Sequence, residues 1–186
     1  MEQPPRDVPE GLTAKEYYQL GVEYKKLGWT EQSRDAMSLA IEGNDPDTAT
    51  SARRFLRTKL PRFPVPLLAE QKNIEGFNLM VTGDAEGARQ MFEELIEEFP
   101  DFEWPYGNLV ILLLQDGEIG RAQELLDAAL QINPDYVGGW LHLATVKASD
   151  KDFAGARDCV ERALSSDPTD GAALAMKEVL DHVDSE

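Results

Sequence analysis

Residues 137–168 read VGGWLHLATVKASDKDFAGARDCVERALSSDP, and this stretch decides the fold class. Its first half places apolar residues three and four positions apart, at Trp140, Leu143 and Ala144, which is typical of one face of a helix. Its second half has the same spacing, and Pro168 then stops the helix. The stretch therefore predicts two short amphipathic helices joined by a turn.

The same pattern occurs earlier in the chain at a fixed step of 34 residues, and chance seldom produces such agreement at several independent positions. The matched series are Pro100, Pro134 and Pro168; Ala88, Ala122 and Ala156; Phe92, Leu126 and Val160; and Leu95, Ala129 and Ala163. Small residues let two helix axes approach closely, and large ones fill the space between repeats. One repeat cannot bury its own apolar stripe, so neighbouring repeats must stack.

This helix-turn-helix unit resembles the tetratricopeptide repeat, and the resemblance covers about three-quarters of the chain. Beyond the series above, it rests on Tyr17, Leu20, Gly21, Tyr24, Met37 and Ala40 in a first repeat, Gly76 and Leu79 in a second, Tyr106, Leu109, Val110 and Leu113 in a third, and Trp140, Leu143 and Ala144 in a fourth. The first repeat departs from the family at Ser33 and Pro46, and the second departs at Lys72 and Glu75. Gly28, Gly83 and Gly117 hold the turn position, where Lys151 predicts a less left-handed turn.

We expect the segments in this order: a flexible Pro-rich tail (1–11), a first repeat (12–46), an inserted basic helix with a Pro-rich connector (47–66), three repeats (67–100, 101–134 and 135–168) and a C-terminal capping helix (169–186). Thr13 and Glu16 have the spacing of a capping box that opens the first helix. The fold class is thus all-α, a right-handed superhelical solenoid of repeats with one extra inserted helix.

The insertion has two interpretations. It is either a lone helix that bridges one continuous stack or a hinge between two pieces. We favour the first, because a single N-terminal repeat is too small to fold alone.

The composition limits the function. The 186 residues hold 18 Lys+Arg and 35 Asp+Glu, for a net charge of −17, and residues 63–186 carry all of this excess. An acidic chain repels nucleic acid and anionic membrane surfaces, so we expect neither as a partner. No apolar run approaches the roughly 20 residues of a membrane helix. We expect a cytoplasmic protein, either a monomer or a homodimer.

No catalytic motif is found in the sequence. His142 and His182 lie far apart, and Cys159 has no nearby base, so a structural role is favoured for the thiol. Clustered glutamates at Glu93, Glu94, Glu97 and Glu98 favour a solvated outer helix face over a metal site. We therefore expect no enzyme activity, no cofactor and no metal.

The resemblance implies that partners lie in the concave groove made by the first helices of the repeats. The register predicts these groove residues: Asn73, Phe77, Met80, Trp104, Asn108, Ile111, Leu114, Leu141, His142 and Thr145. They are largely apolar, as interaction surfaces are. The alternative is a groove filled by the inserted helix or the capping helix.

Family members that bind chaperones hold a peptide carboxylate with Lys, Arg and Asn. The matching positions here hold Tyr18, Val22, Asn108, Gly138 and His142. Only Asn108 agrees with the family, so we expect no carboxylate clamp.

A basic run predicts a secondary surface, at Arg53, Arg54, Arg57, Lys59 and Arg62. It would either dock an acidic partner or pair internally with the acidic repeats.

The sequence thus predicts a non-catalytic scaffold or adaptor that binds a peptide or an amphipathic helix. The alternatives are a small acidic secretion-type chaperone for an apolar substrate and a regulatory subunit of an enzyme complex.

Overall fold

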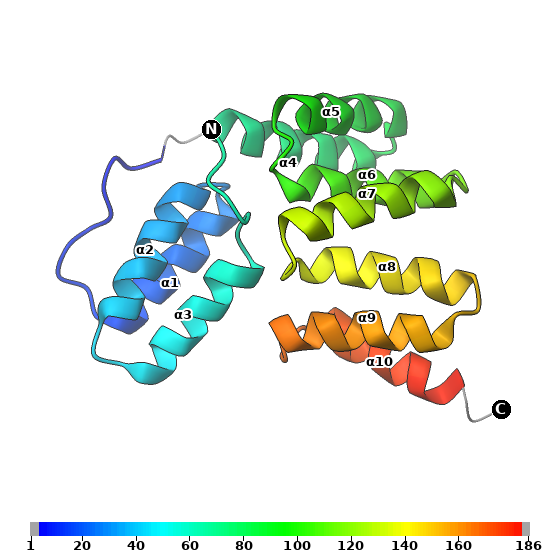
Figure 1. The fold of residues 1–186 in the computed structure, drawn as a ribbon. Coiled ribbons are helices and arrows are strands. Elements are labelled where there is room, and N and C mark those ends of the chain that lie inside the picture. Colours follow the sequence, from blue (N-terminus) through cyan, green and yellow to red (C-terminus); the bar gives the residue numbers. More distant parts are fainter. Residues whose placement is uncertain (1–3, 184–186) are drawn as a thin grey trace. The chain divides into compact units, whose positions relative to one another are not determined.

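The structure, a computed structural model, describes residues 4–183, which form ten α-helices and no strand (Figure 1). The helices are α1 (Ala14–Lys26), α2 (Thr30–Glu42), α3 (Pro46–Thr58), α4 (Leu67–Thr82), α5 (Ala85–Glu98), α6 (Glu103–Gln115), α7 (Ile119–Ile132), α8 (Val137–Ser149), α9 (Phe153–Ser166) and α10 (Gly171–Val183). The chain divides into two compact units, with the boundary inside α4 between Gln71 and Lys72. Unit 1 precedes this boundary and unit 2 follows it. The all-helical repeat architecture expected from the sequence is confirmed.

Unit 1 begins with the hairpin of α1 and α2. Thr13 caps α1: its backbone N–H donates to Glu16 Oε2 at 2.8 Å, and the Glu16 N–H donates to Thr13 Oγ1 at 3.3 Å. The predicted capping box is therefore present. The two helices approach closely because a Cβ atom at Gly21 would lie 2.8 Å from Met37 Cε.

Helix α3 completes the core of unit 1. Asp45 caps its first turn and Pro46 begins it, a position where the missing N–H of proline costs nothing. Ala52, with no exposed surface, packs on Tyr17 and Met37, so α3 covers the apolar side of the hairpin. Val8 also packs on this core, although it lies in the segment predicted as a loose tail.

A buried carboxylate ties α4 to α2 within unit 1. Trp29, the residue before α2, makes no side-chain cap. Instead Glu70, which is 3% exposed, accepts hydrogen bonds from the Thr30 N–H at 3.2 Å and from the Thr30 hydroxyl. Burial raises the pKa of Glu70 despite these bonds.

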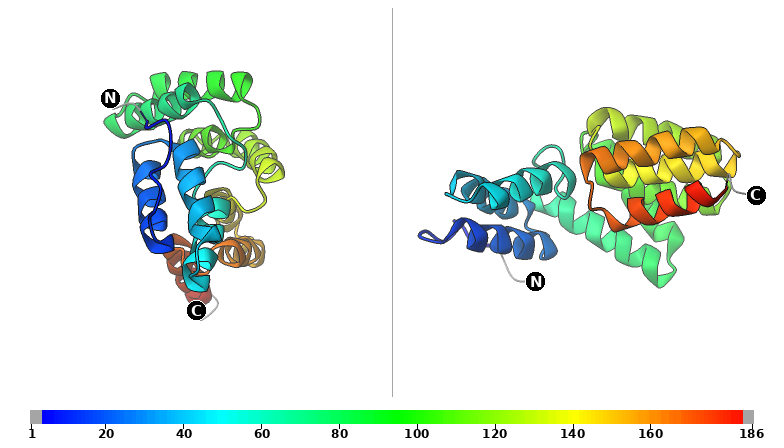
Figure 2. Two further views of the ribbon diagram at one scale, coloured as in Figure 1. Left: turned by 90° about the vertical axis from the view of Figure 1, so that its left-hand side faces the viewer. Right: turned by 90° about the horizontal axis from the view of Figure 1, so that it is seen from below.

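Unit 2 repeats one packing scheme. Helices α6 and α7 form a pair, as do α8 and α9, and α10 packs on both α8 and α9 (Figure 2). Ala88, Ala122 and Ala156 have no exposed surface, as the register predicts. At Gly76 an added Cβ would lie 2.7 Å from the Phe92 ring, so a small residue is needed where α4 crosses α5.

The turns inside the helix pairs correct one expectation. Gly28, Gly83 and Gly117 adopt φ of 75°, 92° and 76°, and Lys151 adopts φ of 62°. The prediction of a less left-handed turn at Lys151 was wrong. The two helices that the turn joins impose the same backbone there, and the lysine bears the strain of a left-handed conformation.

Within residues 4–183, each helix is too short or too polar to span a lipid bilayer.

Candidate protein-interaction surface

The first helices of successive repeats present one series of side chains. Helix α6 contacts α8, and α8 contacts α10, so these helices form the inner side of the repeat array in unit 2. Side chains at a step of 34 residues recur along them, as in the row Phe77, Ile111, Thr145 and Val179. We name the exposed and half-buried members of these rows the A-face: Ile74, Phe77, Met80, Val81, Trp104, Asn108, Ile111, Leu114, His142, Thr145 and Val179.

Helix α4 contributes the most exposed apolar part of the A-face. Ile74, Phe77 and Val81 are 42%, 45% and 68% exposed. They lie at i, i+3 and i+7, so they share one side of the helix. Met80 beside them is half-buried. This side of α4 is an apolar stripe in contact with solvent.

Helix α6 forms the middle of the surface. Trp104 is half-buried and its ring packs against Phe102 with centroids 5.7 Å apart. Ile111 and Leu114 are also half-buried, and each leaves part of its side chain accessible.

Two amides form the polar floor of the A-face. Asn108 Nδ2 donates to Asn73 Oδ1 at 2.9 Å. Asn73 is only 6% exposed, so the prediction that it is an exposed groove residue was wrong. Asn73 is buried on the side of α4 that meets Asn108, and the bond from Asn108 supplies the partner that a buried amide needs.

Helix α8 supplies mixed chemistry. Leu141 packs against the cluster of Val137, Ala163 and Ala173. It therefore belongs to the core rather than to the exposed groove predicted from the sequence. His142 is half-buried, and burial lowers the pKa of its imidazole, which favours the neutral form. Thr145 is exposed, and its hydroxyl donates to the Leu141 carbonyl at 3.0 Å.

Sequence profiles of one family match the chain. Profiles described as tetratricopeptide repeat match residues 79–128, 113–180 and 14–43, which together span more than half of the chain. The chain belongs to the tetratricopeptide repeat family. No curated protein sequence matches it significantly.

Solved structures show the same fold. The Sgt2 tetratricopeptide domain from Aspergillus fumigatus is similar with a TM-score of 0.59 and 18% identity, covering 67% of this chain and 83% of that one. The first such domain of Spaghetti (RPAP3), bound to the HSP90 peptide SRMEEVD, has a TM-score of 0.57 and 14% identity, covering 63% of this chain and 94% of that one. The TPR2B domain of yeast Sti1, in a complex with pHsp70, has a TM-score of 0.57 and 20% identity, covering 64% of this chain and 98% of that one.

Sequence reasoning missed three members of the A-face in this tetratricopeptide repeat protein. Ile74 shares its register with Asn108 and His142, and Val179 shares its register with Phe77 and Thr145. Val81, one turn beyond Phe77, is the third, and Val179 is 63% exposed. The 34-residue step could have found Ile74 and Val179, had it been extended to every position and into the terminal helix.

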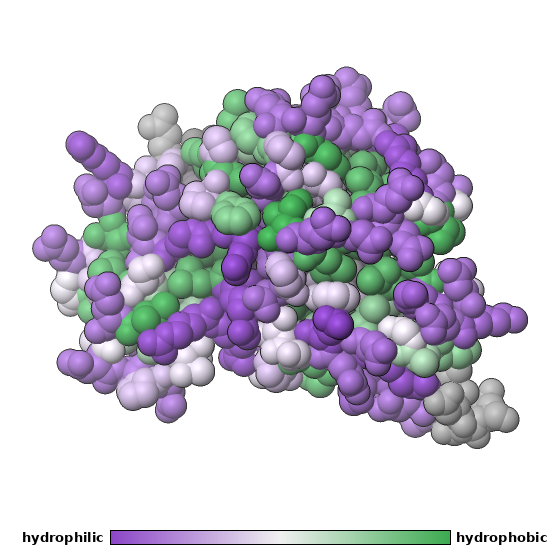
Figure 3. Space-filling view, viewed as in Figure 1, coloured by the Kyte–Doolittle hydropathy of each residue, from purple (hydrophilic) through white to green (hydrophobic). Residues whose placement is uncertain are grey.

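The outer side of the repeats is polar. Hydrophilic side chains predominate over α5 (Figure 3), where Glu86, Glu94, Glu97 and Glu98 are exposed. Among residues 4–183, no group of three His, Cys, Asp or Glu side chains is arranged to hold a metal ion. Glu93 pairs with Arg121 at 2.6 Å rather than with another acid.

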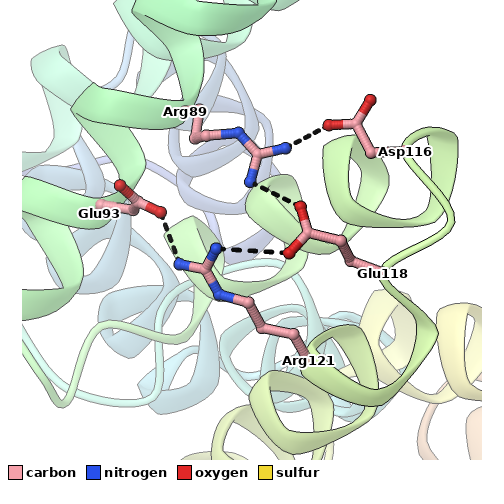
Figure 4. A network of polar contacts seen from close by, with 5 residues as sticks. All are labelled: Arg89, Glu93, Asp116, Glu118 and Arg121. Carbon is pink, nitrogen blue, oxygen red and sulfur yellow. Dashed lines mark hydrogen bonds and ion pairs between the residues drawn. The ribbon is translucent and has the colours of Figure 1, made fainter.

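An ion-pair network links two repeats on this outer side (Figure 4). Arg89 of α5 contacts both Asp116 and Glu118 of the next turn, the latter at 3.4 Å. Arg121 of α7 reaches back to Glu93, and also to Glu118 at 3.7 Å. The network joins the second helices of consecutive repeats.

The basic run predicted as a secondary surface lies on α3 and the connector in unit 1. Arg53, Arg57 and Arg62 are exposed, whereas Arg54 and Lys59 are half-buried. Its role as a binding surface stays a prediction.

Cys159 in unit 2 is 5% exposed, and burial raises the pKa of its thiol, which keeps it in the unreactive protonated form.

Proposed function

We propose that the protein is a non-catalytic interaction scaffold that binds a peptide or an amphipathic helix of another protein on the A-face. The observation that carries the proposal is the solvent-exposed apolar stripe of Ile74, Phe77 and Val81. Large apolar side chains that are exposed together mark interaction sites, because water contact with them is unfavourable until a partner covers them.

Membership of the family supports the same proposal. The related domains of Spaghetti and yeast Sti1 are structures of complexes with an HSP90 peptide and pHsp70. Tetratricopeptide repeats are typically interaction modules, and the buried, protonated Cys159 offers no nucleophile. Burying one large apolar side chain contributes roughly 1.5–3 kcal/mol, so a few anchors of the A-face suffice for modest affinity.

We propose further that the A-face does not hold a peptide carboxylate. The two positions that would be cationic in a carboxylate clamp hold Gly138 and His142. Burial lowers the pKa of His142, so its imidazole is largely neutral at pH 7. Neither position supplies the charge that a carboxylate needs.

Affinity capture from a native cell extract, with the full chain as bait and mass spectrometry as the readout, tests the proposal. The bait is compared with a Phe77→Ala/Val81→Ala variant and with a matched control, Leu174→Ala. Leu174 of α10 is 47% exposed, close to the 45% of Phe77, but it lies outside the A-face rows. All three positions are exposed, so each substitution changes stability by only about 0.5 kcal/mol.

We expect the parent chain and the Leu174→Ala control to retain a partner that the double variant loses. A partner retained equally by all three proteins places binding on another surface and contradicts the proposal.

A further inference from the structure

The charge of unit 2 restricts what covers the A-face. Residues 72–186 hold 24 Asp+Glu and 8 Lys+Arg. Cations of this unit already pair with acids of the same unit: Lys72 with Glu98, Arg89 with Asp116 and Glu118, Arg121 with Glu93 and Glu118, Lys147 with Asp152, and Lys177 with Asp181. The remaining acids leave unit 2 with a strongly negative potential that favours cations and repels anions.

Exposed acids lie at the ends of the helices that carry the A-face. Asp101 precedes the helix α6 and Asp150 directly follows α8, and both are exposed. Asp116, which follows α6, is already paired with Arg89 on the outer side. Helix α6 carries no Lys or Arg, and α8 carries only Lys147, whose ammonium lies 3.3 Å from Asp152. The A-face is thus an apolar surface bounded by negative charge.

The hydrogen-bonding groups of the A-face indicate the backbone conformation of its occupant. An extended peptide needs partners for its own N–H and C=O groups when it is buried, whereas a helix satisfies them internally. Asn73 is buried and accepts a bond from Asn108, and the Thr145 hydroxyl donates to its own helix. An extended peptide would then depend mainly on the remaining capacity of Asn108 and on the half-buried His142. The apolar stripe of α4 instead offers a ridge of side chains suited to helix packing.

We infer that the A-face binds an amphipathic helix whose polar side is rich in Lys and Arg. Its apolar residues pack on Phe77, Val81 and Ile111, and its cations lie near Asp101 and Asp150. This inference rests on the proposed function and names the chemical class of the partner. It also separates this chain from its relative that binds SRMEEVD, a peptide with three acidic residues.

Synthetic peptides test the charge and the conformation separately. Three helical peptides carry Leu at i, i+3, i+4 and i+7, and their polar positions are all Lys, all Gln or all Glu. A fourth peptide keeps the Lys residues but replaces every Leu by Ser, and a fifth is the Lys peptide with two central Pro residues that break the helix. SRMEEVD is the sixth probe. Binding to the full chain is measured by fluorescence anisotropy.

We expect the Lys peptide to bind most tightly, the Gln peptide about tenfold more weakly, and the Glu peptide and SRMEEVD not measurably. Raising the NaCl concentration weakens binding of the Lys peptide and leaves binding of the Gln peptide almost unchanged. The Phe77→Ala/Val81→Ala variant loses about tenfold in affinity for the Lys peptide, while Leu174→Ala does not. The Ser-substituted peptide and the Pro-containing peptide bind at least tenfold more weakly than the Lys peptide.

A charge-matched pair of variants locates the electrostatic contribution. Asp101→Asn/Asp150→Asn removes two acids beside the A-face, whereas Glu86→Gln/Glu124→Gln removes two exposed acids from the outer helices α5 and α7. Only the Asp101→Asn/Asp150→Asn variant should bind the Lys peptide more weakly than the parent chain does, by about three- to tenfold.

The outcomes distinguish the inference from the proposed function. Equal affinity for the Lys and Gln peptides, still sensitive to the Phe77→Ala/Val81→Ala change, overturns the charge preference and leaves the interaction surface standing. Full binding by the Pro-containing peptide overturns the helical conformation. If no peptide responds to the Phe77→Ala/Val81→Ala change, the proposed function itself fails.

Discussion

Lys151 holds a backbone conformation that other repeats give to glycine. Its φ of 62° is left-handed, which a side chain with a Cβ adopts only with strain. The helices α8 and α9 on either side determine the backbone conformation of the turn, and Lys151 adopts it.

Replacing Lys151 with Gly should therefore stabilise unit 2. The strain relieved exceeds the extra entropy of glycine in the unfolded chain, and the expected gain in the free energy of unfolding is about 0.5–1 kcal/mol. Urea unfolding followed by circular dichroism measures it. The matched control is Gly117→Ala, whose Cβ meets nothing within 4 Å, so its expected loss of about 1 kcal/mol comes from the backbone alone. A Lys151→Gly variant less stable than the parent would show that the turn is unstrained.

Glu70 gives unit 1 an unusual dependence on pH. Burial raises its pKa in the folded state above the ordinary value of 4.5. The folded protein then binds this proton more tightly than the unfolded chain does, so the contribution of Glu70 to stability is fully present below pH 4.5 and is lost as the pH rises through the folded pKa.

The Glu70→Gln variant should lack this loss, because glutamine does not ionise. Its amide oxygen can accept the bond from the Thr30 N–H, and its NH2 group can donate to the Thr30 hydroxyl. The stability of the variant relative to the parent is expected to increase as the pH rises from about 4 to 7. Hydrogen exchange of the α2 amides, read by mass spectrometry, reports the stability of unit 1 at each pH. A constant difference between the two proteins across this range would contradict the raised pKa.

At the scale of helices, the network of Arg89 and Arg121 holds consecutive repeats together through charge. The Arg89 side chain is only 17% exposed, whereas its partners Asp116 and Glu118 are 60% and 44% exposed. Surface pairs contribute little one by one, but a shared network with a partly buried arginine contributes more.

Arg89→Met keeps the apolar stem and removes the charge, and the expected cost is about 1 kcal/mol at low salt. This cost should shrink in 1 M NaCl, because salt screens the pairs. Lys177→Met is the control, since the Lys177–Asp181 pair is 3.7 Å long and exposed on both sides, and its cost should be near zero. Thermal unfolding at two salt concentrations measures both variants, and an Arg89→Met cost independent of salt would assign the effect to packing.

At the scale of the whole molecule, charge is divided unequally between the two units. Residues 72–186 hold 24 acids and 8 bases, whereas residues 1–71 hold 11 acids and 10 bases. Like charges that are held close together repel one another in the folded state and less in the extended chain.

Salt should therefore stabilise unit 2 more than unit 1. Raising NaCl from about 50 to 500 mM shortens the range of the repulsion below the distances between most surface charges. Hydrogen exchange resolved by segment should show slower exchange in α6 and α8 and little change in α1 and α2. Equal changes in both units would show that net charge does not limit the stability of unit 2.

The 34-residue spacing by itself determined much of this protein. Local propensity and periodicity suffice to predict the helices and their ends just before Pro100 and Pro134, because these properties depend on residues close in sequence. They also suffice to predict the burial of Ala88, Ala122 and Phe92. The capping box of Thr13 and Glu16 is local in the same way.

Only the tertiary structure decided the rest. The burial of Asn73 by Asn108, the bond of Glu70 to Thr30 and the pairing of Arg121 with Glu93 each join residues 28 to 40 positions apart. The backbone of Lys151 follows from the two helices that meet there, and the exposure of Ile74 and Val81 follows from which helices pack on α4. Such features depend on which surfaces approach one another in space, and a repeat pattern records only which residues are able to face inward.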